Sequence, residues 1–90
     1  MEITPSILTA DFCRLGETID EAIEAGINWL HMDVMDGNWV VNRTITFGPA
    51  LIRSIRERVG PEITIDCHLM VTNAEETWEQ YAQAGADLII

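Results

Sequence analysis

The chain has 90 residues, is 48% hydrophobic and carries a formal net charge of −10, from five arginines and fifteen acidic residues. This length allows one small globular unit, and the charge argues against nucleic acid as a partner because phosphates would be repelled. No run of roughly 18 apolar residues predicts a transmembrane helix, and the start lacks the features of a secretory signal. Cys13 and Cys67 are too few for a disulfide framework. We therefore expect a cytoplasmic protein.

The first half of the chain predicts two strands and a helix between them. Residues 3–8, ITPSIL, form a short β-branched segment typical of a strand. Residues 12–26, FCRLGETIDEAIEAG, predict a helix that ends at Gly26, because apolar side chains recur at helical spacing. These side chains are Leu15, Ile19, Ala22 and Ile23. Residues 29–35, WLHMDVM, predict the second strand.

The second half continues this alternation after a long loop. Pro49 suits the first position of a second helix, whose apolar stripe ends at Gly60. The stripe comprises Leu51, Ile52, Ile55 and Val59. Residues 62–71, EITIDCHLMV, predict the third strand, and residues 87–90, DLII, begin a fourth.

A third helix is expected between the last two strands. Asn73 can cap it, with Glu76 as its capping-box partner, and Gly85 can end it. The predicted apolar face of this helix comprises Trp78, Tyr81 and Ala82. The resulting order βαβαβαβ predicts a parallel sheet with right-handed crossovers. Ala-Gly pairs at 25–26 and 84–85 form a faint repeat, as expected of a βα barrel.

Two of the predicted strands carry polar side chains on one face. Because side chains alternate along a strand, His31 and Asp33 share a face of the second strand, and Asp66 and His68 share a face of the third. The carboxyl ends of parallel strands meet at one edge of a sheet, where ligands bind. Ser6 on the first strand is in register to join them. The pattern therefore predicts a site at this edge.

The predicted site has the chemistry of a metal centre. Two imidazoles and a carboxylate suit Zn²⁺, Mn²⁺ or Fe²⁺. Such a metal polarises a substrate carbonyl or stabilises an enediolate, and an adjacent carboxylate can remove a proton α to that carbonyl. Met35 and Met70 would supply an apolar floor.

Each of these residues also has a structural interpretation. A single histidine on a half-buried strand is more often structural than a ligand, and Met35 and Met70 taken alone are typical core residues. Asp66 either pairs or faces solvent, Asp36 is interpreted as a turn residue, and Cys67 as inert packing. The matched pattern on two adjacent strands is what favours metal binding.

Five segments, PSILTADF, HMDVMDGN, TFGP, DCHLMV and AGAD, resemble the N-terminal half of ribulose-phosphate 3-epimerases. These TIM-barrel enzymes of the pentose phosphate pathway interconvert ribulose 5-phosphate and xylulose 5-phosphate. They use a divalent metal and two acids on opposite faces of the substrate. The resemblance covers nearly the whole chain in order, and it implies an α/β fold, a single (βα)4-type half-barrel domain over residues 1–90.

The resemblance also implies roles for the predicted site residues. His31, Asp33 and His68 would bind the metal, which by this resemblance is Zn, Fe, Mn or Co. Asp33 would also be one of the two acid/base groups. The residues expected to contact the small phosphorylated sugar are Ser6, Met35, His68 and Met70.

The chain departs from the family pattern in two ways. It supplies four strands of eight, and the second catalytic aspartate and the phosphate-binding loops of the family lie in the other half. Val41 stands where the family usually has proline, in a slightly longer loop.

Two interpretations follow from these departures. Unpaired edge strands favour self-association, so two copies would close an eight-stranded ring as a homodimer that binds a metal and has weak or no epimerase activity. In the alternative, the chain is a non-catalytic truncated or engineered half-barrel whose only property is assembly. A separate C-terminal half-barrel is a further candidate partner. Whether this chain is an enzyme stays open at this point.

Overall fold

The computed structural model describes residues 12–39, 43 and 45–90. Its elements are the 3-10 helix η2 (Phe12–Arg14), α1 (Leu15–Glu24), β1 (Trp29–Met35), α2 (Pro49–Val59), β2 (Thr64–Met70), α3 (Ala74–Ala84) and β3 (Leu88–Ile89). These match the helices and strands predicted for this part of the chain. The strand predicted over residues 3–8, with Ser6, and Val41 lie outside the described residues. None of the described helices is long and apolar enough to span a membrane.

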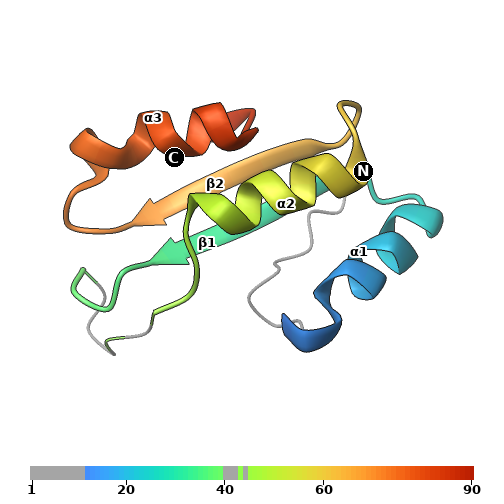
Figure 1. Cartoon of the computed structure of the whole chain (residues 1–90), viewed down its shortest axis with the longest axis horizontal. Helices are drawn as coiled ribbons and strands as arrows, with labels where there is room; N and C mark the ends of the chain where they lie inside the picture. Colours follow the sequence, from blue (N-terminus) through green and yellow to red (C-terminus); the bar gives the residue numbers. More distant parts are fainter. Residues whose placement is uncertain (1–11, 40–42, 44) are drawn as a thin grey trace.

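The three described strands form one parallel sheet in the order β1-β2-β3. Figure 1 shows β1 and β2 side by side. β1 and β2 pair along their full length, so that His31 lies opposite Asp66 and Asp33 lies opposite His68. The ladder extends beyond the two residues of β3, because the backbone N–H of Ile90 donates to the carbonyl oxygen of Cys67 at 2.9 Å. This arrangement is consistent with the N-terminal half of a TIM barrel, as the sequence predicts.

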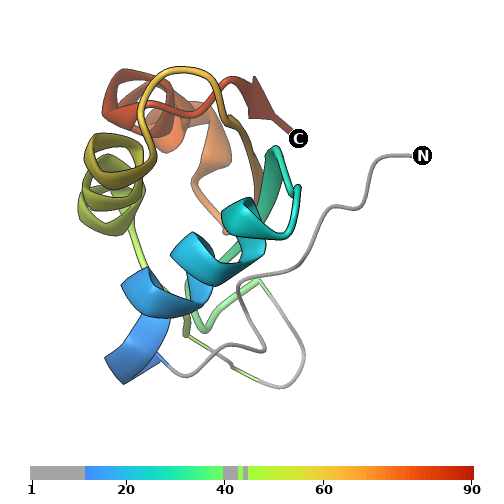
Figure 2. The same cartoon turned by 90° about the vertical axis from the view of Figure 1, so that its right-hand side faces the viewer.

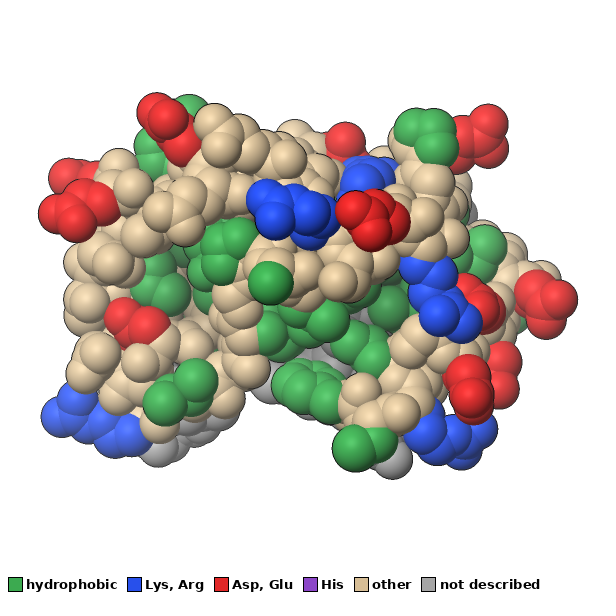
Figure 3. Space-filling view, in the orientation of Figure 1, with side chains coloured by type: hydrophobic (Ala, Val, Ile, Leu, Met, Phe, Trp, Pro, Cys, Tyr) green, Lys and Arg blue, Asp and Glu red, His purple; other side chains and the backbone are tan. Residues whose placement is uncertain are grey.

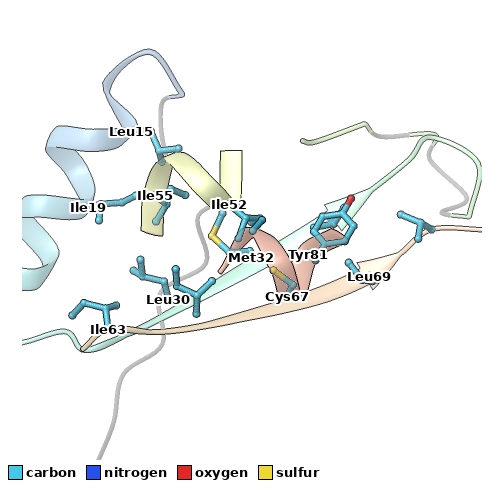
Figure 4. Close-up of a cluster of buried hydrophobic side chains, with 14 residues drawn as sticks. Leu15, Ile19, Leu30, Met32, Ile52, Ile55, Ile63, Cys67, Leu69 and Tyr81 are labelled. Carbon is cyan, nitrogen blue, oxygen red and sulfur yellow. The ribbon is translucent and has the colours of Figure 1, made fainter. Parts of the chain in front are cut away.

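The three α-helices curve around one face of the sheet (Figure 2). Every second side chain of β1 points towards them, and Leu30, Met32 and Val34 are at most 1% exposed. Ile19 and Ile52 pack from the helices into the same layer (Figure 4). Burial of an aliphatic side chain of this size contributes about 1.5–3 kcal/mol, so this layer holds the strands against the helices.

The predicted ends of α2 and α3 are confirmed. α2 begins at Pro49, whose missing N–H would be unpaired at this position in any case. Gly60 and Gly85 follow the two helices with φ of 83° and 125°. Only glycine adopts this left-handed region at little cost, which explains why both helices end there.

Two expectations for α3 are wrong. Asn73 is the N-cap residue, but its side chain makes no capping bond, and its carbonyl oxygen instead accepts the backbone N–H of Glu76 at 3.0 Å. Trp78 is 46% exposed and Ala82 is also exposed, whereas the buried side chains of the helix are Tyr81 and Ala84. Tyr81 and Ala84 are three positions apart and therefore share a helix face. This is the face of α3 that packs towards the sheet.

Candidate metal centre

The predicted site residues lie on the face of the sheet that is opposite to the helices. His31 and Asp33 project from β1 and His68 projects from β2, and all three are partly exposed. Among the described residues, no histidine is visible on the helix-bearing face (Figure 3). The register explains the convergence, because His68 lies opposite Asp33 and His31 is two positions away on the same face of β1.

One carboxylate oxygen of Asp33 faces both imidazoles. Its Oδ1 lies 2.8 Å from Nε2 of His31 and 3.7 Å from Nδ1 of His68. Potential ligand atoms from the three residues all lie within 4.8 Å of one another. The side chains of Asp33, His31 and His68 are 17%, 27% and 42% exposed, so the cluster can be reached from solvent.

The buried carboxylate of Asp66 holds the other nitrogen of His31. It accepts a hydrogen bond from Nδ1 of His31 and another, at 2.5 Å, from Nε1 of Trp29. Of the two alternatives that the sequence left open, Asp66 therefore pairs. Burial of the His31 ring acts to lower its pKa, but the hydrogen bonds to Asp66 and Asp33 outweigh this effect and raise the pKa above its usual value.

This set of donors fits a divalent cation. When neutral His31 keeps its proton on Nδ1 for Asp66, its lone pair lies on Nε2, the atom that faces Asp33. A carboxylate on the far nitrogen is the usual support of a metal-bound histidine. Two imidazoles and a carboxylate suit Zn²⁺, Fe²⁺ or Mn²⁺. A cation can therefore bind at the Nε2 lone pair without any change at Asp66.

Thr46 connects the loop after β1 to the site, a role that the sequence pattern did not indicate. Its hydroxyl donates to the carbonyl oxygen of Asp33 and accepts from the backbone N–H of Met35, both at 2.9 Å. Its backbone N–H donates to the carbonyl oxygen of Met35 at 3.1 Å. These bonds fix the end of β1 that carries Asp33. The sequence feature that could have indicated this role is a threonine in a loop, because threonine hydroxyls often hydrogen-bond to backbone groups.

Asp36 was expected to be a turn residue, and the structure confirms this and adds a second contact. One carboxylate oxygen accepts the backbone N–H groups of Asn38 and Trp39, each at 2.9 Å. The other accepts the backbone N–H and the hydroxyl of Thr72. These hydrogen bonds, above all that from the Thr72 backbone, hold the pKa of Asp36 well below its ordinary value. Asp36 thus joins the loops that follow β1 and β2.

Comparison with known proteins identifies the family. The sequence profile of the Ribulose-phosphate 3 epimerase family matches residues 2–90. The chain belongs to this family. Ribulose-phosphate 3-epimerases from Synechocystis sp. and Escherichia coli K12 are 49% and 46% identical to it over 87 residues, which is 97% of this chain. The cytoplasmic isoform from Oryza sativa is 45% identical over 85 residues, or 94% of this chain.

The resemblance carried by the five sequence segments is thereby confirmed. The chain spans 36–37% of the length of these ribulose-phosphate 3-epimerases. Family membership therefore supports the fold described above, the N-terminal half of a TIM barrel.

Four further residues can be compared with their expected places. Met35 and Met70 lie opposite each other at the ends of β1 and β2, both partly buried. Cys67 lies on the helix-facing side, where burial, together with the charge of Asp66, raises the pKa of its thiol to about 12. Such a thiol is unreactive, as the sequence predicts. Ser6 is outside the described residues.

Proposed function

We propose that this chain forms the metal-binding half of a ribulose-phosphate 3-epimerase site, in which Asp33 is one of two acid/base groups. The observation that supports this proposal is the convergence of His31, Asp33 and His68 at the carboxyl edge of two paired strands. Family membership supports the choice of substrate, ribulose 5-phosphate or xylulose 5-phosphate. The reaction is proton exchange at C3.

Asp33 can serve as both ligand and base. A carboxylate has two oxygens, so one can bind a cation while the other takes the C3 proton. When bound, the cation, which we propose is Zn, Fe, Mn or Co, would stabilise the negative charge that develops on the substrate oxygens. Thr46 holds the backbone carbonyl of Asp33 in place, and Met35 and Met70 would border the reacting carbon with apolar surface.

The proposed half-site can be tested by deuterium exchange. The metal-loaded chain is incubated with ribulose 5-phosphate in D₂O, and C3 is followed by NMR. Asp33 can remove a proton and return deuterium on the same face, so we expect exchange that is lost in Asp33→Asn. The matched control is Glu79→Gln, which removes an exposed carboxylate on α3.

Each result of this experiment has a distinct meaning. Xylulose 5-phosphate appearing beside the exchange would show that a second donor, supplied by another chain, acts on the opposite face. Deuterium exchange at C3 without formation of xylulose 5-phosphate would show that only the Asp33 side of the site acts. No exchange above the Asp33→Asn level would contradict the proposal and favour the alternative, a non-catalytic half-barrel whose property is assembly.

We propose that self-association completes the sheet. Within the described part of the chain, β1 and β3 each pair with β2 alone, and Leu88 on β3 is 44% exposed. An edge strand with exposed apolar side chains is a template for pairing, and two copies can close a ring with twofold symmetry. In such a ring, the partner copy would offer His68 and Met70 where the family has its second catalytic aspartate.

Analytical ultracentrifugation tests this assembly. We expect a dimer for the wild type and a shift towards monomer for Leu88→Glu. Trp78→Glu is the matched control, because Trp78 is similarly exposed at 46% but lies on α3. A wild type that is monomeric at all concentrations would contradict self-association, and a gain of activity on mixing with a C-terminal half-barrel would then identify that half as the partner.

We also propose a cytoplasmic location. The relatives include a cytoplasmic isoform from Oryza sativa and a chloroplastic enzyme from Arabidopsis thaliana, so family membership alone does not assign a compartment. Cell fractionation with an antibody against the chain would decide the location.

A further inference from the structure

A chain of hydrogen bonds leads from Trp29 through Asp66 to His31. Trp29 and His31 are alternate residues of β1 and share a face, while Asp66 lies on β2 directly opposite His31. Each carboxylate oxygen of Asp66 accepts one N–H. Oδ2 takes the indole N–H of Trp29, and Oδ1 takes Nδ1–H of His31.

We propose that Asp66 and Trp29 form a tautomer lock for His31. Asp66 keeps the proton of the neutral imidazole on Nδ1, against the competing carboxylate of Asp33 at 2.8 Å from Nε2, so that the lone pair of Nε2 can bind a cation shared with Asp33. Trp29 keeps Asp66 in the orientation that makes this possible. The lock rests on the function proposed above, because it matters only if Nε2 of His31 binds a cation. Asp66 and Trp29 are positioning residues, since the ligand cluster consists of His31, Asp33 and His68.

The surroundings of Asp66 require each of its two carboxylate oxygens to accept a hydrogen bond. The indole N–H of Trp29 can only donate, and an ionised carboxylate is the side chain that accepts without donating. Asp66 is 4% exposed, so water has little access to replace a missing partner. Among the described residues, no buried side-chain nitrogen or oxygen lacks a hydrogen-bond partner. An amide at this position would satisfy only one of the two donors.

The substitution Asp66→Asn therefore makes a specific prediction. Because Trp29 can only donate, the amide oxygen should turn to Trp29 and the amide NH₂ should face Nδ1 of His31. Nδ1 must then accept, which moves the imidazole proton to Nε2 and blocks the ligand atom. Removing the indole N–H by Trp29→Phe lets the amide rotate. The double variant Trp29→Phe, Asp66→Asn removes this constraint on the amide, so the share of Nδ1–H should be higher than in Asp66→Asn alone.

Two measurements on the 90-residue chain test the lock. Long-range ¹H–¹⁵N correlation spectra of ¹⁵N-histidine-labelled, metal-free chain in alkaline buffer report the tautomer, and a His68→Gln variant assigns the His31 signals. Competition with a chelator reports Zn²⁺ affinity. We expect Nδ1–H in the wild type and in Trp29→Phe, Nε2–H in Asp66→Asn, and a larger share of Nδ1–H in the double variant than in Asp66→Asn. Zn²⁺ affinity should fall by about 10–100-fold in Asp66→Asn, the usual effect of losing such a support, and should recover in part in the double variant.

The outcomes separate the lock from the metal site. Nε2–H in the wild type overturns the lock without any variant, and so does Nδ1–H in a folded Asp66→Asn chain. If Asp66→Asn does not fold, the wild-type tautomer decides. Failure of the proposed function is distinguishable, because wild-type Zn²⁺ affinity no higher than that of Asp33→Asn would remove the metal site while the tautomers still followed the expected order.

Discussion

Thr72 donates two hydrogen bonds to one carboxylate oxygen of Asp36, from its backbone N–H at 3.0 Å and from its hydroxyl at 3.1 Å. The two residues follow β2 and β1, so this pair joins two loops at the edge of the sheet that carries the candidate metal centre. Both bonds require Asp36 to accept, and its charged form accepts most strongly. The geometry of the site edge is therefore linked to the ionisation of an aspartate that is not a proposed ligand.

The substitution Asp36→Asn should lower the free energy of unfolding at neutral pH. It should also make this free energy fall less steeply as the solution becomes acidic. The pKa of Asp36 is lowered from 3.8, chiefly by the Thr72 backbone N–H. Stability from a lowered pKa is present above the pKa of the unfolded chain and is lost as pH falls through the folded pKa. Urea midpoints should therefore drop less below pH 3.8 for Asp36→Asn than for the wild type. Glu57→Gln, an exposed carboxylate on α2, should follow the wild type, and parallel curves for all three proteins would contradict the prediction.

Tyr81 and Trp78 should respond very differently to truncation. Tyr81 is 6% exposed and packs in the core, whereas Trp78 is 46% exposed. We expect Tyr81→Ala to reduce the free energy of unfolding by about 3 kcal/mol or more, as for other buried aromatic side chains. Trp78→Ala should change it by about 0.5 kcal/mol or less, as is usual at the surface. Equal losses in urea denaturation would place both side chains in the core and contradict the structure.

Arg56 should not be replaceable by lysine. Its guanidinium donates to the carbonyl oxygens of Gly60 (2.8 Å), Ile63 (2.6 Å) and Gly85 (2.7 Å) and to the carboxylate of Asp87 (2.6 Å). These bonds tie the end of α2 to the segments that lead into β2 and β3. A lysine amine cannot reproduce this planar fork, so Arg56→Lys should reduce the free energy of unfolding by about 1–3 kcal/mol. Arg53→Lys, exposed on the same helix, should be close to neutral, and a similar loss in both variants would count against this role.

Zinc binding should release a proton. Despite its partial burial, His31 has a raised pKa because of its bonds to Asp66 and Asp33, so the metal-free imidazole keeps its proton to a higher pH than an ordinary histidine does. A raised pKa also contributes stability that is present below pH 6.5 and is lost as pH rises through the folded pKa. A cation must displace the Nε2 proton.

Calorimetric titration in buffers of different ionisation enthalpy measures this proton. We expect proton release on Zn²⁺ binding at mildly acidic pH, decreasing as pH rises. Identical heats in all buffers at mildly acidic pH would show that no proton leaves, and His31 would then not be a ligand. His31→Gln is the control, and its heats should depend on the buffer less than those of the wild type.

Local features of the sequence account for the order of elements. The period-2 alternation of β1, proline at the start of α2 and glycines after α2 and α3 act within a few residues, so they can be recognised without any partner. The same alternation placed His31 and Asp33 on one face. The buried face of α3 was not predictable in this way, because both Trp78 and Tyr81 satisfy helical spacing and only packing against the sheet selected Tyr81.

The sequence by itself determined an alternating α/β chain of the epimerase family and a polar face with two histidines and an aspartate. Only the tertiary structure decided which groups support that face. Asp66 reaches His31 across 35 positions and Thr72 reaches Asp36 across 36. Such contacts depend on strand register and loop placement, and neither leaves a local pattern in the sequence. The candidate ligands are therefore visible in the sequence, whereas the hydrogen bonds that orient them are set by the pairing of β1 with β2.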